Sequence, residues 1–217
     1  FKSFFDFWRS KKLALHEPEF PLDAVILPNR TSFAEFALKD AGEQGRSSHG
    51  YYSVPTNRMV HYDLTADLPK TGGRNRSDIS ARLEASAYNL ATVVHEATHQ
   101  IAFNSGMHTR LADNPLWLTE GLAMFCETPD LKSRSGWKTI GTLNKKRLSD
   151  FQNFIRQRRK PDSLKTLVAD SRRFGGDQSV ATESYAEAWA LTFFLVKTRP
   201  EKYTDYLRHI AGKKPLI

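Results

Sequence analysis

The nine residues TVVHEATHQ, from Thr92 to Gln100, decide how the fold of this sequence is interpreted. They place His95 and His99 four positions apart, with Glu96 directly after the first histidine. On an α-helix, positions i and i+4 lie on one face, so the two imidazoles can converge on a single metal ion. Glu96 points about 100° away from His95, where its carboxylate can accept a proton from a water molecule at the metal. The pattern H-E-x-x-H is typical of zinc hydrolases.

The residues around this motif predict a buried helix over residues 80–104. Its apolar side chains cover most of the circumference: Val93, Val94, Ala97, Ile101 and Ala102. Two histidines and a carboxylate are costly to bury unless each of them has a partner. A metal ion would supply that partner, and the alternative is a hydrogen-bonded pair of core histidines.

A catalytic zinc ion usually has three protein ligands and one open position, so a third ligand must come from elsewhere in the chain. The pattern HExxHxxGxxH is excluded, because Ala102 and Ser105 occupy the positions of its glycine and its third histidine. His108 lies in a polar connection, and we expect it at the surface. Glu120 is the better candidate, because it lies in the middle of the apolar face of a predicted helix over 115–127 and needs a cation there.

Other residues of this second helix have interpretable positions. Asn114 and Pro115 predict its start, with the asparagine side chain as the cap and the proline in the first turn. Gly121 would allow the helix to approach another backbone closely. Glu127 lies on the same face as Glu120, and it is either an acceptor for a ligand histidine or an ordinary carboxylate at the end of the helix.

The remaining sequence predicts an α+β fold in a single domain over 1–217, with 1–20 as an N-terminal helical extension. Further helices are expected over 1–15, 32–42, 183–198 and 201–212, the second of them starting at Ser32 and ending at Gly42. Strands are expected over 22–28, 50–54 and 58–64, the first of them a buried strand and the last two an antiparallel hairpin.

The composition is that of a globular protein, with 217 residues of which 40% are hydrophobic and 26% charged. The longest apolar run, 189–196, is far too short to span a membrane. The net charge of +8 could attract an acidic polymer, but no nucleic-acid-binding motif accompanies it, and we interpret it as a solvated surface. Cys126 is the only cysteine, which excludes an internal disulfide. Because the chain begins at Phe1 without a signal-peptide pattern, we interpret it as a processed or trimmed piece.

HEATH (95–99) followed by WLTEGLA (117–123) is similar to the gluzincin branch of zinc metallopeptidases, whose second zinc helix often carries a W-L-x-E-G-x-A run. The longer pattern resembles more closely an uncharacterised family of bacterial gluzincin-like domains that are often exported. Four segments carry this resemblance: GYYSVPTNRMVHYD (50–63), VVHEATHQIAFNSG (93–106), PLWLTEGLAMFCE (115–127) and SYAEAWALTFFL (184–195).

The resemblance implies zinc as the cofactor, His95, His99 and Glu120 as its ligands, and Glu96 as the general base. It also implies a zincin-like fold, in which a small mixed sheet packs on the active-site helix and further helices follow. Gluzincins often stabilise the reaction's oxyanion with a tyrosine or histidine of a later helix; Tyr185 resembles that residue, and core packing is its alternative role.

Two further implications concern the substrate and the location. Zincins bind an extended substrate along a sheet edge. The segment GYYS (50–53) would be that edge, and an ordinary hairpin strand is the alternative. The resemblance also implies an extracytoplasmic protein that is secreted, periplasmic or anchored through a segment preceding Phe1.

The expected function is zinc-dependent hydrolysis of a peptide or protein substrate. Glu96 would accept a proton from the zinc-activated water and deliver it to the leaving nitrogen, while Tyr185 stabilises the oxyanion. One rival is a zinc amidase that acts on a non-peptide or cell-wall amide. Another is a catalytically inactive zincin-like binding module that makes its contacts through the basic surface. The full set of ligands and base argues against the module, because a purely structural zinc site does not need Glu96.

Overall fold

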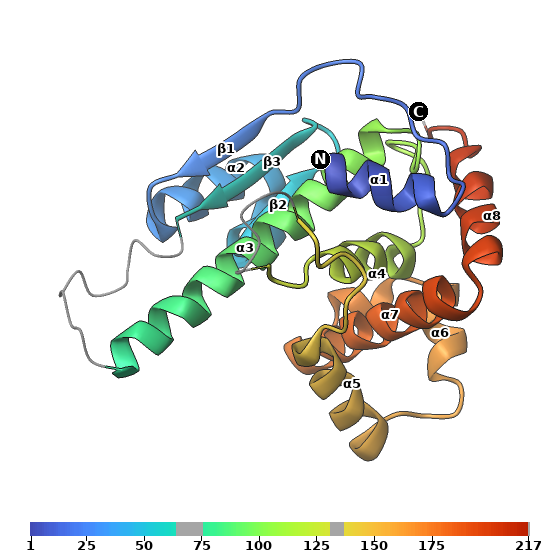
Figure 1. Ribbon diagram of the computed structural model, residues 1–217. Helices are drawn as coiled ribbons and strands as arrows, with labels where there is room; N and C mark the ends of the chain where they lie inside the picture. The colour runs from blue at the N-terminus through green and yellow to red at the C-terminus, as the bar shows by residue number, and fades with distance from the viewer. Residues whose placement is uncertain (64–75, 131–136, 217) are drawn as a thin grey trace.

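The computed structural model describes residues 1–63, 76–130 and 137–216, and these have the expected α+β fold. A small sheet lies beside a larger group of helices, as Figure 1 shows. The elements are, in chain order, α1 (Lys2–Ser10), β1 (Ala24–Leu27), α2 (Arg30–Ser47), β2 (Gly50–Ser53), β3 (Arg58–Tyr62), α3 (Arg76–Asn104), α4 (Leu116–Cys126), α5 (Lys145–Gln157), α6 (Ser163–Ala169), the 3-10 turn η1 (Arg172–Gly175), α7 (Gln178–Thr198) and α8 (Pro200–Ala211).

The three strands form a mixed sheet in the order β1-β3-β2. β2 and β3 form the predicted antiparallel hairpin, whereas β1 runs parallel to β3. The prediction of a buried first strand is wrong: β1 is an edge strand, and Ile26 is 72% exposed. Alternate residues of a strand face opposite sides of the sheet, and only Val25 and Leu27 pack against the core beneath α2.

Helix α2 covers one face of the sheet, where Phe33 and Ala37 pack on Val60 and Tyr62. Its cap is Asn29 and not the predicted Ser32, because the Asn29 side chain accepts a hydrogen bond from the Ser32 N–H.

Gly42 interrupts α2 at the predicted end of the helix. It has a φ of +69°, which favours glycine, and the backbone is not helical at this residue. Helical structure resumes beyond this kink and continues to Ser47.

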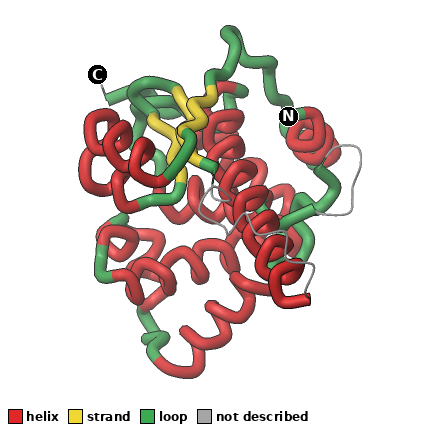
Figure 2. Tube along the Cα trace, turned by 90° about the vertical axis from the view of Figure 1, so that its left-hand side faces the viewer, coloured by secondary structure: helices red, strands yellow, loops and turns green. Residues whose placement is uncertain are grey.

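Helix α3 packs on the other face of the sheet and carries the opening motif through the middle of the molecule (Figure 1). Its C-terminal part is buried, with Ala102 fully enclosed and Ile101 nearly so. The expectation of burial around the motif is only partly right, because Val93 is 41% exposed. In Figure 2 the helix extends past the strands, so its first half lies outside the sheet layer.

Helix α4 is the centre of the helical layer, and its residues from Trp117 to Cys126 are buried except Glu120. It crosses α7 at Gly121, where an added Cβ would lie 2.7 Å from the Ala188 carbonyl oxygen and even closer to the Thr192 hydroxyl. The predicted close approach at Gly121 is therefore confirmed. Helices α1, α5, α6 and α8 complete this layer around α4 and α7 (Figure 2).

The predicted start of α4 is correct in position but not in mechanism. Pro115 is the cap residue, and no side chain caps the helix. The Asn114 amide instead donates hydrogen bonds to the carbonyl oxygens of Thr109 and Ala112, at 2.8 and 3.0 Å, and so fixes the preceding connection.

The predicted N-terminal helix ends at Ser10, which is shorter than expected. Phe4, Phe5 and Trp8 are buried in the same core as α4, and the Trp8 ring stacks on Tyr203 of α8 at 6.1 Å between centroids. Within the described part of the chain, no helix is long and apolar enough to cross a membrane.

Candidate metal centre

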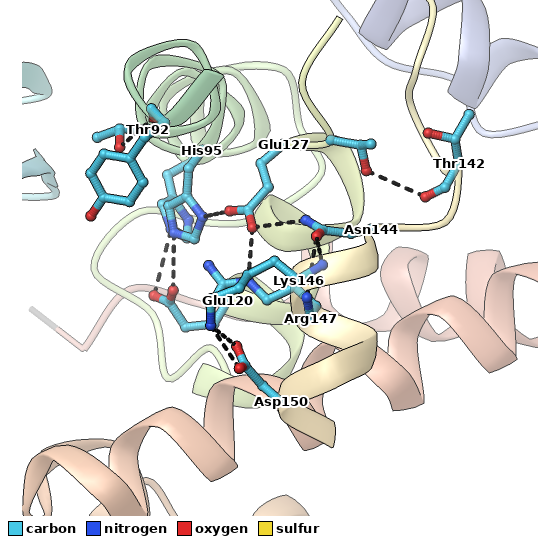
Figure 3. Close-up of polar contacts among 12 residues, drawn as sticks. Thr92, His95, Glu120, Glu127, Thr142, Asn144, Lys146, Arg147 and Asp150 are labelled. Carbon is cyan, nitrogen blue, oxygen red and sulfur yellow. Dashed lines mark hydrogen bonds and ion pairs between the residues drawn. The ribbon is translucent and has the colours of Figure 1, made fainter. Parts of the chain in front are cut away.

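The two histidines of the motif and Glu120 meet between α3 and α4 (Figure 3). His95 Nε2 lies 3.2 Å from His99 Nε2 and 3.2 Å from Glu120 Oε2. His99 Nε2 lies 3.5 Å from Glu120 Oε1. The structure thus brings together all three predicted ligands, which come from two neighbouring helices.

This spacing fits a tetrahedral zinc ion. Bonds of about 2.0–2.1 Å at tetrahedral angles separate the ligand atoms by about 3.3 Å. The two Nε2 atoms are at that separation, whereas a hydrogen bond between them would be a long one. Two imidazole nitrogens and one carboxylate are also the ligand set of catalytic zinc sites, which keep a fourth position open.

Glu127 orients the first of the histidines. Its Oε2 lies 2.8 Å from His95 Nδ1, as Figure 3 shows. When Nδ1 donates its proton to this carboxylate, the lone pair of Nε2 is free to bind a metal. Of the two roles considered for Glu127, the structure therefore favours the acceptor for a ligand histidine.

Glu127 is in turn held by α5 and its cap. Arg147 Nε donates to Glu127 Oε1 at 2.8 Å, and Asn144 Nδ2 donates to the same oxygen at 3.2 Å. Burial alone would raise the pKa of Glu127, but the charges of Arg147 and His95 and their hydrogen bonds lower it. The carboxylate therefore stays ionised beside His95. Arg147 and Asn144 are not among the predicted site residues, because the sequence led us to interpret the positive charge as a solvated surface.

The charges of the metal-free site are strongly coupled. Burial alone would lower the pKa of His95, yet hydrogen bonds to Glu120 and Glu127 raise it well above its usual value. Burial alone would raise the pKa of Glu120, yet the charge of His99 and the hydrogen bonds from both histidines hold it far below its usual value. An anion that attracts protons onto its neighbours will also attract a metal cation in their place.

Glu96 lies beside the three ligands and not among them. It is nearly buried, and the backbone amide of Tyr52 hydrogen-bonds to its carboxylate. Burial raises its pKa, and the charges of His95 and His99 partly offset this rise. A carboxylate with a raised pKa beside a candidate metal centre is suited to accept and release a proton.

Tyr185 approaches the same site from α7. The negative charges of Glu120 and Glu96, together with burial, raise the pKa of its phenol, so the hydroxyl stays protonated and can donate a hydrogen bond. The other proposed role, core packing, is also visible, since its ring lies edge-on to Phe174 at 5.2 Å between centroids. The structure is compatible with both roles.

The edge strand β2 lies against α3, and the backbone amide of Tyr52 acts on Glu96 in the direction that lowers its pKa. The free edge of the sheet therefore borders the candidate base.

The expectation that His108 lies at the surface is wrong, because it is only 2% exposed and its ring packs edge-on against Phe103. Burial lowers the pKa of His108 to about 3, so it is neutral at physiological pH.

Residues 89–217 match the family model DUF1570, whose description is "Protein of unknown function". The chain belongs to the DUF1570 family. The matched part of this DUF1570 member contains His95, His99, Glu96, Glu120 and Tyr185, whereas the sheet lies before it. No curated protein and no solved structure matches the chain.

Proposed function

We propose that this protein is a zinc-dependent hydrolase that cleaves peptide bonds. The observation that carries the proposal is the cluster of His95, His99 and Glu120 at the spacing of a tetrahedral zinc site, with the carboxylate of Glu96 beside it. The resemblance of the two zinc motifs to gluzincins supports it. Zn²⁺ would supply Lewis acidity, which lowers the pKa of water and polarises a carbonyl group.

The residues of the chain divide the remaining work. Glu96 accepts a proton from the attacking water and delivers it to the leaving nitrogen. The Tyr185 hydroxyl donates a hydrogen bond to the developing oxyanion. Glu127 holds the His95 ring in the tautomer that leaves Nε2 free, and Arg147 keeps Glu127 ionised.

Peptides are the favoured substrates because the unpaired edge of the sheet lies beside the base. Gly50–Ser53 pairs with β3 on one side only, so its other side can pair with an extended chain. A strand bound there would run past Glu96, next to which the Tyr52 backbone lies.

Metal content tests the first half of the proposal. Protein purified without chelator should contain about one zinc ion per chain, and Glu120→Ala should lose most of it, because a three-ligand site loses its only anionic ligand. Elemental analysis of both proteins gives the answer, with Glu84→Ala as the control on an exposed part of α3. Wild-type protein without zinc, even after zinc is added back, would leave the histidines as a core pair and the protein as a binding module.

Hydrolysis tests the second half. We expect Glu96→Gln to keep its zinc and to lose peptide turnover by a factor of at least about 10²–10⁴, the range typical of a general base. The assay is a panel of peptides and cell-wall fragments with zinc-loaded protein. Full activity of Glu96→Gln would contradict the role of the base, and cleavage of cell-wall amides alone would favour the amidase.

A further inference from the structure

Arg147 has hydrogen-bond donors that the fold does not use. A guanidinium carries five N–H donors. Only Nε of Arg147 is engaged, with Glu127 Oε1 at 2.8 Å. Neither terminal nitrogen bonds to another residue in the described ranges, and the side chain as a whole is 25% exposed. Four donors of a charged group are therefore without a partner among the described residues.

These donors lie close to the candidate metal centre. Glu127 bridges His95 and Arg147, so the guanidinium and the ligand imidazole are one carboxylate apart. Figure 3 shows Arg147 on the side of Glu127 that faces Glu120. The positive charge of Arg147 also acts on the phenols of Tyr88 on α3 and Tyr185 on α7. The guanidinium is thus surrounded by residues of α3, α4 and α7 that border the site.

The nearby acidic groups do not use these donors. Asp150, the acidic residue one turn along α5, binds Lys146 through both of its oxygens at 2.6 Å. Glu120 faces the two histidines, and its oxygens lie at ligand distance from them. The anchored Nε fixes the plane of the guanidinium, which lowers the entropy cost of binding a further anion.

We propose that the two terminal nitrogens of Arg147 bind a carboxylate group of the substrate. The planar fork of a guanidinium matches the two oxygens of a carboxylate, and such pairs are among the strongest hydrogen bonds in proteins. This inference rests on the proposed peptidase function and narrows its substrate class to peptides with a carboxylate near the scissile bond. That carboxylate is either the C-terminus of the chain or an acidic side chain.

Matched peptides distinguish the two sources. The assay uses three short N-acetylated peptides. The first has a free C-terminal carboxylate, the second has the same sequence with a C-terminal amide, and the third is this amide with one internal residue replaced by glutamate. They are assayed for kcat and KM with zinc-loaded wild type, Arg147→Gln, Arg147→Lys and Lys146→Gln. The last variant removes the neighbouring positive charge and is the matched control. Zinc content is measured for each protein, because Arg147 also holds Glu127.

Wild type should prefer one of the two carboxylate peptides over the plain amide by about 10- to 100-fold in kcat/KM, the range of charge-assisted hydrogen bonds. Arg147→Gln should remove this preference, mainly by raising KM. Arg147→Lys, which keeps the charge without the fork, should fall between, and Lys146→Gln should keep the preference. A preference for the free C-terminus indicates removal of residues from the chain end, and a preference for the glutamate peptide indicates internal cleavage.

Two results would overturn the inference: no preference in wild type, or the same preference in zinc-loaded Arg147→Gln. Calorimetric titration of the three peptides into zinc-loaded Glu96→Gln, with and without Arg147→Gln, measures the same preference without turnover. A carboxylate preference in binding but no hydrolysis by wild type would refute the proposed function and leave Arg147 as a binding residue. Hydrolysis without any preference would refute only the role of Arg147.

Discussion

Two carboxylates on crossing helices, one fully buried and one largely buried, have opposite surroundings. Glu187 on α7 is 2% exposed and accepts hydrogen bonds from Arg159, Arg173 and Ser163 at 3.0, 2.9 and 2.8 Å. Glu120 on α4 faces only the imidazole nitrogens of two histidines, the nearer at 3.2 Å.

The difference separates Glu187, a structural anion, from Glu120, which in the proposed function binds a cation. Two guanidinium groups neutralise and saturate Glu187, so nothing further is needed there. The partners of Glu120 are imidazoles, which become neutral metal ligands once their protons leave. Burial alone therefore does not mark a functional carboxylate, whereas the number and kind of its partners do.

The largest expected effect concerns the saturated carboxylate. Glu187→Ala leaves two arginines without their buried counter-ion and should lower the free energy of unfolding by about 3–5 kcal/mol. Urea denaturation followed by circular dichroism measures it. Asp205→Ala removes an exposed ion pair of the same type and should change stability by no more than about 1 kcal/mol. The folded fraction of Glu187→Ala should keep its zinc. Loss of zinc from the folded protein would contradict the distinction between a structural Glu187 and a metal-binding Glu120.

A smaller effect is expected for Glu127, which contacts the candidate ligand His95. Glu127→Ala removes the acceptor of His95 Nδ1 and should weaken zinc binding by about 10- to 100-fold, the range found for such supporting residues. Competition with a zinc-binding dye measures the affinity. Asp150→Ala is the control, because Asp150 pairs with Lys146 and does not touch Glu127. Equal affinities of Glu127→Ala and wild type would mean that His95 is oriented by packing alone.

The last expected effect is a pH dependence of stability outside the candidate metal centre. His61 on β3 is buried without a hydrogen-bond partner among the described residues, and burial lowers its pKa to about 4 from 6.5. Because the unfolded chain binds the proton more readily, His61 contributes stability above pH 6.5 that is lost as the pH falls from 6.5 toward 4. The loss amounts to at most about 1.4 kcal/mol per pH unit.

Thermal unfolding of wild type and His61→Phe at several pH values in this range checks the prediction. The variant should lose less stability than wild type on acidification. Parallel curves for the two proteins would show that His61 is not the group that titrates.

The cluster of His95, His99 and Glu120 could be predicted because its residues follow local patterns. The spacing of His95 and His99 fixes a common helix face, and Glu120 stands out as a charge on an apolar face. The hairpin of β2 and β3 and the close approach at Gly121 were predictable for the same reason.

What the sequence could not reveal depends on the folding of the chain back on itself. His108 is in a polar stretch, but its N–H bonds to the Ala102 carbonyl six residues earlier, and this turn lays the ring against Phe103. Asn114 caps no helix because its amide is engaged by carbonyls of the same connection.

Arg147 shows the same limitation at longer range. In the sequence it is one of three consecutive basic residues, Lys145 to Arg147, at the start of α5. Only the fold, which places the start of α5 beside Glu127 at the C-terminal end of α4, selects Arg147 as the partner of Glu127, while Lys146 pairs with Asp150 and remains mostly exposed. A contact between separate helices leaves no periodic signal in either of them.

The crossing at Gly121 has a mechanical consequence. Glu120 directly precedes this glycine, and Tyr185 lies one helical turn before Ala188, whose carbonyl oxygen occupies the space that a side chain would need. The backbones of α4 and α7 are therefore in direct contact, with no side chain between them, and neither helix can slide past the other without a steric clash. This contact fixes the distance between the Glu120 carboxylate and the Tyr185 phenol. Motions of the surrounding loops should therefore change access to the site without changing that distance.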